Sequence, residues 1–359
     1  MSANWISLPS LLVACLTAAL VASGCGEAAR FEAPAASQRT GAFRFFSPQS
    51  FWNRPVRGET PDARSRPLVE RLAEEAEAEQ EAEVGPWINT SSYSVPLVRV
   101  GLRQPTTQVR LASPYDEPGL RRAFAAVPLP SDAEPAAGSD AHLVLWQPAR
   151  DRLWEFWHLR RTAAGWKAGW GGAIRQLSDA SGAYGPSAWP GATSLWGASA
   201  SSLSIAGGLI TFGDLARHSI DHALALSVPN VRARFYALPA RRTDGVAADR
   251  LALPEGAHLR LRPGLDLSSL ELPPLTLMIA EAAQRYGIFV RDRASTICFY
   301  AQAPAPGADP YSGPGGAFEG RTPRELLEGF PWRDLQVLPM RLRHFKRGET
   351  PAGRREART

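Results

Sequence analysis

Cysteine is scarce in this chain, and only Cys298 lies beyond the first 25 residues. One cysteine cannot form an internal disulfide, so the fold must be stabilised by its core. Cys298 lies in the strand-like run TICFYAQ. A small buried side chain is favoured there over a nucleophile.

Several common catalytic motifs are also absent. The chain contains no GxSxG, HExxH, GxxxxGK[ST], GxGxxG or CxxC motif and no EF-hand loop. These absences argue against the common serine hydrolases, zinc peptidases, nucleotide enzymes and zinc modules. The sequence predicts no cofactor and no metal site, although a metal-dependent enzyme of another class stays a lesser alternative.

No apolar run is long enough to cross a membrane. Residues 11–22, LLVACLTAALVA, fall short of the ~20 residues that a bilayer requires. The run ends in ASGC at 22–25, which resembles a lipoprotein signal with cleavage before Cys25 and lipid added to that residue. A simple secretory signal is the alternative, and residues 1–10 lack the usual Lys or Arg. We expect residues 1–25 to be a signal and 26–42 a tether, giving an exported protein that is a membrane lipoprotein or is secreted.

A basic surface over the whole fold is missing as well. The net charge of +5 equals the charge of residues 341–358 alone, which hold seven Arg or Lys and two Glu. A nucleic-acid-binding domain would carry a basic face on its fold, so no nucleic-acid partner is expected. We interpret 341–359 as a solvated basic tail; contact with an acidic envelope polymer or lipid headgroups is the less favoured alternative.

Glycine and proline are frequent, with 31 residues of each. Short alternating or β-rich runs recur between turn residues from 87 to 302, which is typical of many short strands. The pattern predicts one mostly β domain over 43–340, an antiparallel β-sandwich or jelly roll. Peripheral and packing helices are expected at 63–84 and 273–287, with shorter helices at 211–218 and after Thr322.

Four tryptophans gather in residues 154–172, WEFWHLRRTAAGWKAGWGG. In a regular strand Trp154, His158 and Arg160 share one face with Phe156, a mixture that suits a sugar-binding cleft. A tryptophan-rich core is the alternative. The substrate-binding residues predicted from this stretch are Trp154, Trp157, Trp166, Trp170 and Arg160.

Histidine, arginine and aspartate residues elsewhere suggest acid–base chemistry. His222 follows Asp221, and His158 is a second strand histidine that could meet it as acid, base or metal ligand; a core histidine is the alternative. The segment PARRTDG, 239–245, places Arg242 and Asp244 either in a hairpin loop or at a sheet rim. The predicted catalytic residues are His222, His158, Asp221, Arg242 and Asp244.

One further polar pair lies at the start of a predicted strand. Asp140 and His142 in GSDAHLVLW share strand parity, and a structural turn is the favoured interpretation.

A set of motifs spread over roughly residues 45–302 carries a resemblance. FWN, GSDAHLVLW, WEFWH, IDHALAL and RTDG together resemble a group of secreted bacterial proteins to which no activity is assigned. The resemblance supports the limits of the domain and implies no residue role.

Two functional hypotheses follow. The first is an exported carbohydrate-active enzyme that cleaves or modifies a polysaccharide. A lyase would use Arg160 or Arg242 with a histidine base, and a hydrolase would need facing carboxylates such as Glu155 and Asp244. The second is a non-catalytic protein that binds a glycan or the cell envelope. Both make a polysaccharide the expected partner, with membrane contact through lipidated Cys25.

Overall fold

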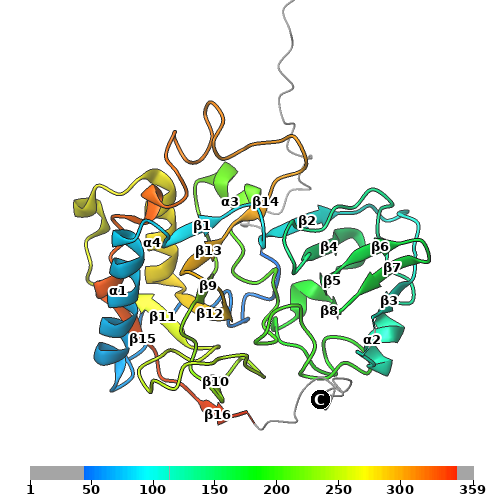
Figure 1. Ribbon diagram of the computed structural model, residues 1–359, viewed down its shortest axis with the longest axis horizontal. Coiled ribbons are helices and arrows are strands. Elements are labelled where there is room, and N and C mark those ends of the chain that lie inside the picture. The colour runs from blue at the N-terminus through cyan, green and yellow to red at the C-terminus, as the bar shows by residue number, and fades with distance from the viewer. Residues whose placement is uncertain (1–43, 113, 346–359) are drawn as a thin grey trace, which may run out of the picture. The chain divides into compact units, whose positions relative to one another are not determined.

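The computed structural model describes residues 44–112 and 114–345 (Figure 1). The predicted signal with Cys25, the tether at 26–42 and the last residues of the basic tail lie outside the described residues. Within the described part, no helix is both long and apolar enough to cross a membrane.

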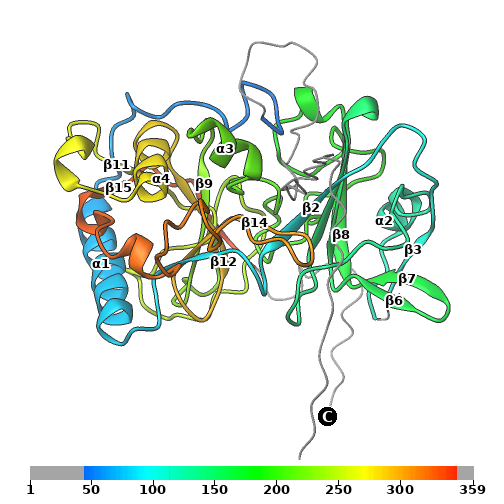
Figure 2. The same ribbon diagram turned by 90° about the horizontal axis from the view of Figure 1, so that it is seen from above.

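A six-stranded sheet forms one side of the fold, in the order β1-β13-β9-β12-β11-β15. Two helices, α1 (Ser65–Glu81) and α4 (Pro274–Arg285), contact it, and their apolar residues share a core cluster with its strands (Figures 1 and 2). The strands are β1 (Trp87–Asn89), β9 (Leu224–Val228), β11 (His258–Leu261), β12 (Ile288–Arg293), β13 (Cys298–Tyr300) and β15 (Leu335–Val337).

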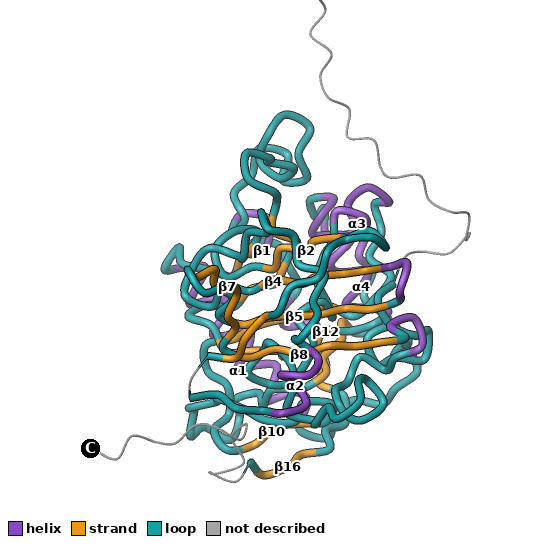
Figure 3. Tube along the Cα trace, turned by 90° about the vertical axis from the view of Figure 1, so that its right-hand side faces the viewer, coloured by secondary structure: helices purple, strands orange, loops and turns teal. Residues whose placement is uncertain are grey.

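A five-stranded sheet forms the other side, in the order β14-β2-β4-β5-β8 (Figure 2). Its strands are β2 (Val95–Arg99), β4 (Leu143–Gln147), β5 (Arg152–Trp157), β8 (Trp170–Arg175) and β14 (Gln302–Ala303). A small sheet of β3 (Val109–Leu111), β7 (Gly165–Ala168) and β6 (Arg160–Thr162) and the helix α2 (Pro118–Ala123) complete this side. Long loops join the strands of both sheets (Figure 3).

The expected helices are present, with shorter bounds than predicted. α1 buries Leu68, Val69 and Leu72 as its early apolar residues require, and α4 begins with proline in its first turn. α3 (Phe212–Arg217), within the range predicted for a short helix, begins with a capping box between Thr211 and Asp214. Short 3₁₀ helices occupy Pro148–Arg150, Leu177–Asp179, Leu267–Leu270, Glu325–Leu327 and Trp332–Asp334.

The β-rich prediction is confirmed, but the antiparallel part of it is wrong. β12 runs parallel to β9, β1 to β13 and β2 to β4, so both large sheets are mixed. Parallel neighbours require long connections, which join segments far apart in the sequence and leave no local signal. The chain passes from one sheet to the other at Ala301, between β13 and β14. The jelly-roll arrangement is not confirmed.

Regular structure extends into the range that the sequence analysis assigned to the basic tail. Leu342–His344 form β16, which pairs antiparallel with β10 (Phe235–Ala237). The Phe345 amide then donates to the Arg234 carbonyl at 2.8 Å. The domain therefore continues through Phe345, because these residues have backbone partners.

Candidate functional site

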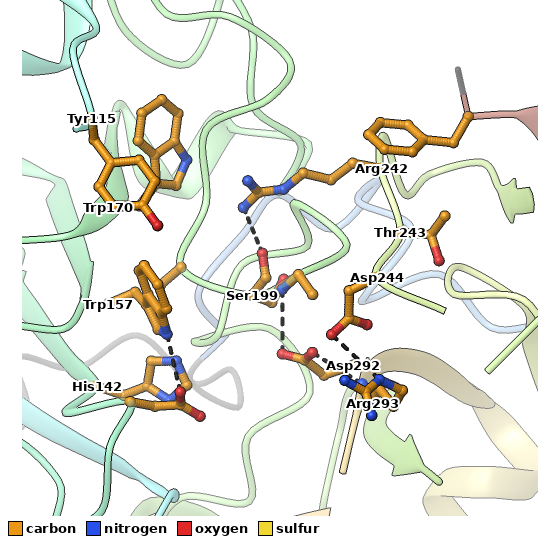
Figure 4. A pocket seen from close by; sticks show the side chains of 14 residues that line it. Tyr115, His142, Trp157, Trp170, Ser199, Arg242, Thr243, Asp244, Asp292 and Arg293 are labelled. Carbon is orange, nitrogen blue, oxygen red and sulfur yellow. Dashed lines mark hydrogen bonds and ion pairs between the residues drawn. The ribbon is translucent and has the colours of Figure 1, made fainter. Parts of the chain in front are cut away.

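A hollow of about 570 Å³ lies between residues from the two large sheets. Figure 4 shows aromatic side chains on one wall and charged side chains on the wall opposite. The aromatic and ionisable residues that line the hollow include Tyr115, Asp140, His142, Trp157, Trp170, Arg242, Asp244, Asp292 and Arg293.

The aromatic wall consists of Tyr115, Trp157 and Trp170. Trp157 and Trp170 are direct partners in the β5–β8 register, so their side chains lie on the same face. The Tyr115 ring contacts both indoles, with centroids 6.0 and 6.1 Å away. The indole of Trp157 donates to Asp140 Oδ1 at 3.0 Å and stacks on His158 at 3.6 Å. These contacts fix the rings in place before any ligand binds.

Three carboxyl groups, Asp244, Glu255 and Asp292, form a cluster on the opposite side. One oxygen from each lies within 4.8 Å of the others. Glu255 is fully buried, and its Oε2 accepts the Asp244 amide at 3.2 Å. Asp244 is exposed and pairs with Arg293 at 3.5 Å. We call these three residues the carboxylate cluster.

A β-bulge positions Asp292. The register of β12 against β9 shifts between Val290 and Asp292, so Arg291 is the extra residue. Regular alternation would place Asp292 on the face of Ile288 and Val290, which belong to the helix-side core. The bulge instead allows Asp292 to line the hollow, where the Ala200 amide donates to it at 3.4 Å.

Backbone contacts on both sides position Glu255. Its carbonyl accepts the Ala237 amide at 2.7 Å, and the Gly256 amide donates to Val290 at 2.7 Å. Gly256 has φ +82, and a Cβ there would collide with the Ala237 carbonyl. The position therefore requires glycine, and it fixes the buried carboxyl beside Asp292.

Burial and mutual repulsion raise the pKa values of the cluster. Burial, Asp244 and Asp292 raise the pKa of Glu255 well above its ordinary value. Burial and the charge of Asp244 raise the pKa of Asp292 to about 7. Desolvation also raises the pKa of Asp244, against the opposing charge of Arg293. Near neutral pH, Glu255 is thus protonated and Asp292 is poised to give up its proton, while Arg293 favours ionised Asp244.

Two further titratable groups line the same hollow. Arg242 donates to the carbonyls of Gly197 and Ser199 at 3.0 and 2.7 Å, and burial lowers its pKa to about 10, so it stays charged. His142 is 5% exposed, and burial lowers its pKa to about 4. It is therefore a neutral imidazole at physiological pH.

The cluster also offers oxygen ligands for a hard cation. Three carboxylates supply part of the six to eight oxygens that Ca²⁺ takes. Asp244 also pairs with Arg293 at 3.5 Å, and without a cation the raised pKa of Asp292 favours its protonated form. The same oxygens can therefore hold shared protons or a cation.

The structure brings together four of the residues predicted from the sequence: Trp157, Trp170, Arg242 and Asp244 all line the hollow. Asp140 and His142, interpreted as a structural turn, line it as well. Arg242 and Asp244 belong to a loop without a hairpin.

The other predicted residues lie elsewhere. Trp154 and Trp166 are buried in the core, and the indole of Trp154 donates to the Ala123 carbonyl at 3.2 Å. The cleft-facing side of β5 carries Trp157, so the face expected for the cleft was the wrong one. Arg160 is exposed on β6, away from the hollow.

The predicted histidine pair does not meet in the hollow. His222 Nε2 lies 3.4 Å from Asp214 Oδ2, and its Nδ1 lies 2.9 Å from the Ala223 carbonyl. Burial opposes its charged form, but Asp214 outweighs burial and raises the pKa of His222. Asp221 pairs with Arg285 at 3.7 Å. The segment before β9 is thus held to α3 through His222 and Asp214 and to α4 through Asp221 and Arg285.

Sequence reasoning missed Asp292, Arg293, Glu255 and Tyr115. The signal available for the first two was a charged pair at the end of the apolar strand IFVRDR. Glu255 occurs in PEG, which reads as an ordinary turn, and Tyr115 carries no local signal.

The raised pKa of Asp292 predicts a stability change. A carboxyl whose pKa is higher in the folded state than in the unfolded state destabilises the fold as pH rises from about 4 to about 7. We expect Asp292→Asn to be more stable than the wild type at pH 8, by roughly 1–4 kcal/mol, and nearly equal to it at pH 4. Urea unfolding at both pH values measures this. The exposed Asp179→Asn is the control, and a destabilised Asp292→Asn at pH 8 would contradict the assignment.

Comparisons of the chain with protein families, with curated proteins and with solved structures found no match.

Proposed function

We propose that the protein binds a polysaccharide in this hollow and hydrolyses one of its glycosidic bonds. The observation that carries the proposal is the carboxylate cluster opposite the aromatic wall. Asp292 has a pKa of about 7 and lies within reach of Asp244, which pairs with Arg293. Aromatic faces bind sugar rings, and a protonated acid beside an ionised one is the pair that hydrolysis needs.

Each acid then has a distinct task. Asp292 donates its proton to the leaving oxygen as the bond from that oxygen to the anomeric carbon breaks. Asp244 attacks the anomeric carbon, and water later displaces it while Asp292 takes the proton from that water. The oxygens of the cluster lie within 4.8 Å, closer to the ~5–5.5 Å typical of this retaining route than to the ~6.5–9.5 Å of the inverting one.

Elimination by a lyase fits the charges less well. A lyase needs a cation to neutralise the uronate carboxylate and a base to remove the C5 proton. His142 is neutral and suits the base, but both nearby cations are engaged. Arg242 donates to two carbonyls, and Arg293 pairs with Asp244.

A non-catalytic glycan-binding protein is the second candidate. The observation that favours it is the aromatic wall itself, since stacking on Trp157 and Tyr115 requires no titratable pair. In either case we propose an exported protein, attached through lipid on Cys25 if it is so processed, with a polysaccharide partner.

The test is a reaction of the full-length chain with neutral and uronic-acid polysaccharides. Reducing ends without ultraviolet absorbance are the expected result and indicate hydrolysis. Reducing ends with absorbance from unsaturated ends would indicate a lyase and overturn the roles of the two aspartates. Retention on immobilised glycan without either signal would support the binding protein. Parallel reactions with EDTA, followed by Ca²⁺, test a cation in the cluster.

The pH profile of hydrolysis follows from the same groups. We expect kcat/KM to fall as pH rises through about 7, because Asp292 loses the proton that it must donate. The acidic limb should reflect protonation of Asp244, whose pKa is raised by desolvation. Initial rates from pH 3 to 10 measure both limbs, and a rate that still increases above pH 8 would exclude Asp292 as the acid.

A further inference from the structure

A second hollow of about 580 Å³ adjoins the first. The two share four lining residues, Asp140, His142, Asp292 and Arg293. Asp292 is therefore accessible from both hollows and lies where they meet. A ligand polymer that lies along the aromatic wall of the first hollow can therefore continue past Asp292 into the second hollow.

Exposed aromatic rings line the second hollow as well. Trp87, the first residue of β1, is 41% exposed, and Tyr93 is 46% exposed. Tyr93 has φ +65, and its ring lies against Gly138, where a Cβ would come within 2.8 Å of the ring. Two exposed aromatic rings in the lining of one hollow provide flat apolar surfaces on which a ligand can stack.

The residues that line the second hollow alone are all uncharged, and several of them are polar. Asn89, Thr90, Ser91, Ser92, Ser295 and Thr296 supply amide and hydroxyl groups. The acidic and basic side chains of this lining are Asp140, Asp292 and Arg293, all shared with the first hollow, and Arg293 already pairs with Asp244. A polymer with a carboxylate on each unit would face Asp140 without a free cation, and it would face a second like charge whenever Asp292 ionises, so a charged polymer is disfavoured.

We propose that the two hollows form one groove that binds a neutral polysaccharide on both sides of Asp292, with Trp87 and Tyr93 as stacking platforms for the second side. The position of cleavage, which rests on the proposed hydrolysis, is then internal to the polymer. Long products should therefore appear before sugars of one or two units.

The test measures binding and cleavage separately. Affinity electrophoresis in gels that contain soluble β-glucan, xylan, mannan, polygalacturonate or alginate uses Asp292→Asn to prevent cleavage, with the wild type at 4 °C as a second background. We expect retention by at least one neutral polymer. Trp87→Ala and Tyr93→Ala should each weaken that retention roughly three- to tenfold, and Trp87→Phe should restore most of it. Leu102→Ala is the control, because this exposed side chain lines neither hollow.

The outcomes separate this inference from the proposed hydrolysis. The groove proposal would be overturned if Trp87→Ala and Tyr93→Ala bound neutral polymers as tightly as Leu102→Ala. It would also be overturned if binding of polygalacturonate or alginate depended equally on Trp87 and Tyr93. No retention by any neutral polymer would do the same. Retention that depends on Trp87 and Tyr93 supports the groove even if the wild type releases no products, in which case only the hydrolysis fails. Release of single sugars from the first minutes would overturn internal cleavage.

Discussion

Asp292→Asn is expected to lower kcat for polysaccharide hydrolysis by about 10²- to 10⁴-fold, the usual contribution of a general acid. The asparagine amide keeps the shape of the side chain and an oxygen for the Ala200 amide, but it has no proton to donate. KM should change little, because the stacking rings lie on the opposite wall. Initial rates on the polymer that the wild type cleaves best measure the effect.

Asp244→Asn tests the proposed role of Asp244 as the nucleophile in the same assay. This variant should lose the covalent step, and added azide should restore part of the rate, since a small anion can replace the missing carboxylate. Asp292→Asn is not expected to respond to azide in the same way on a substrate with a poor leaving group. Asp179→Asn should retain wild-type kinetics, because this exposed residue lies outside the hollow. A fully active Asp292→Asn would remove the proposed mechanism.

The carboxylate cluster that supplies the proposed acid and nucleophile also lowers the stability of the fold. Three carboxyl groups within 4.8 Å repel one another when they ionise, and the buried Glu255 increases that repulsion. The raised pKa values of Glu255 and Asp292 favour their protonated forms, and this reduces the repulsion within the cluster. A variant that loses activity and gains stability at pH 8 would be the combined signature of Asp292.

Much of the local structure was predictable because its causes are local. The capping box at Thr211 and Asp214, the proline at the start of α4 and the hairpin between β4 and β5 each depend on residues a few positions apart. Sheet order depends instead on pairings such as Trp87 with Cys298, for which the sequence contains no local signal. The direction of such strands could not be predicted from one sequence.

The candidate site was predictable in its composition and not in its geometry. Trp157, Trp170, Arg242 and Asp244 were selected because tryptophan and arginine suit sugar recognition, and all four line the hollow. Regular strand parity would not have found Asp292, because a bulge at Arg291 changes the face on which it lies. Parity also placed the cleft on the Trp154 face of β5, whereas that face packs in the core.

Glu155 is a buried acid with a structural role. It was considered as a hydrolase carboxylate, but it is fully buried and accepts hydrogen bonds from the Ala198 amide at 2.7 Å, the Ser204 hydroxyl at 2.6 Å and the Ile205 amide at 3.0 Å. All three donors belong to the loop that carries Ala198, Ser199 and Ala200 to the hollow. One side chain of β5 thus fixes the loop against the sheet.

Glu155→Ala is therefore expected to lower the free energy of unfolding by about 3–5 kcal/mol, since it leaves three buried donors without an acceptor. Glu155→Gln should cost less, about 1–3 kcal/mol, because its oxygen replaces one acceptor while its amide group faces a donor. Urea unfolding at pH 7 measures both. Because the loop borders Asp292, the folded fraction of Glu155→Gln should also bind polysaccharide less tightly.

Glu134→Ala is the control for removal of a carboxyl group, as Glu134 is exposed, and it should change stability by less than about 0.5 kcal/mol. If Glu155→Ala were equally mild, the loop from Ala198 to Ile205 would have to be held by other contacts. If Glu155→Gln instead kept its stability and lost only turnover, Glu155 would act in the chemistry, and the acid pair would have to be reassigned. Loss of stability together with weaker binding is the result that the three hydrogen bonds require.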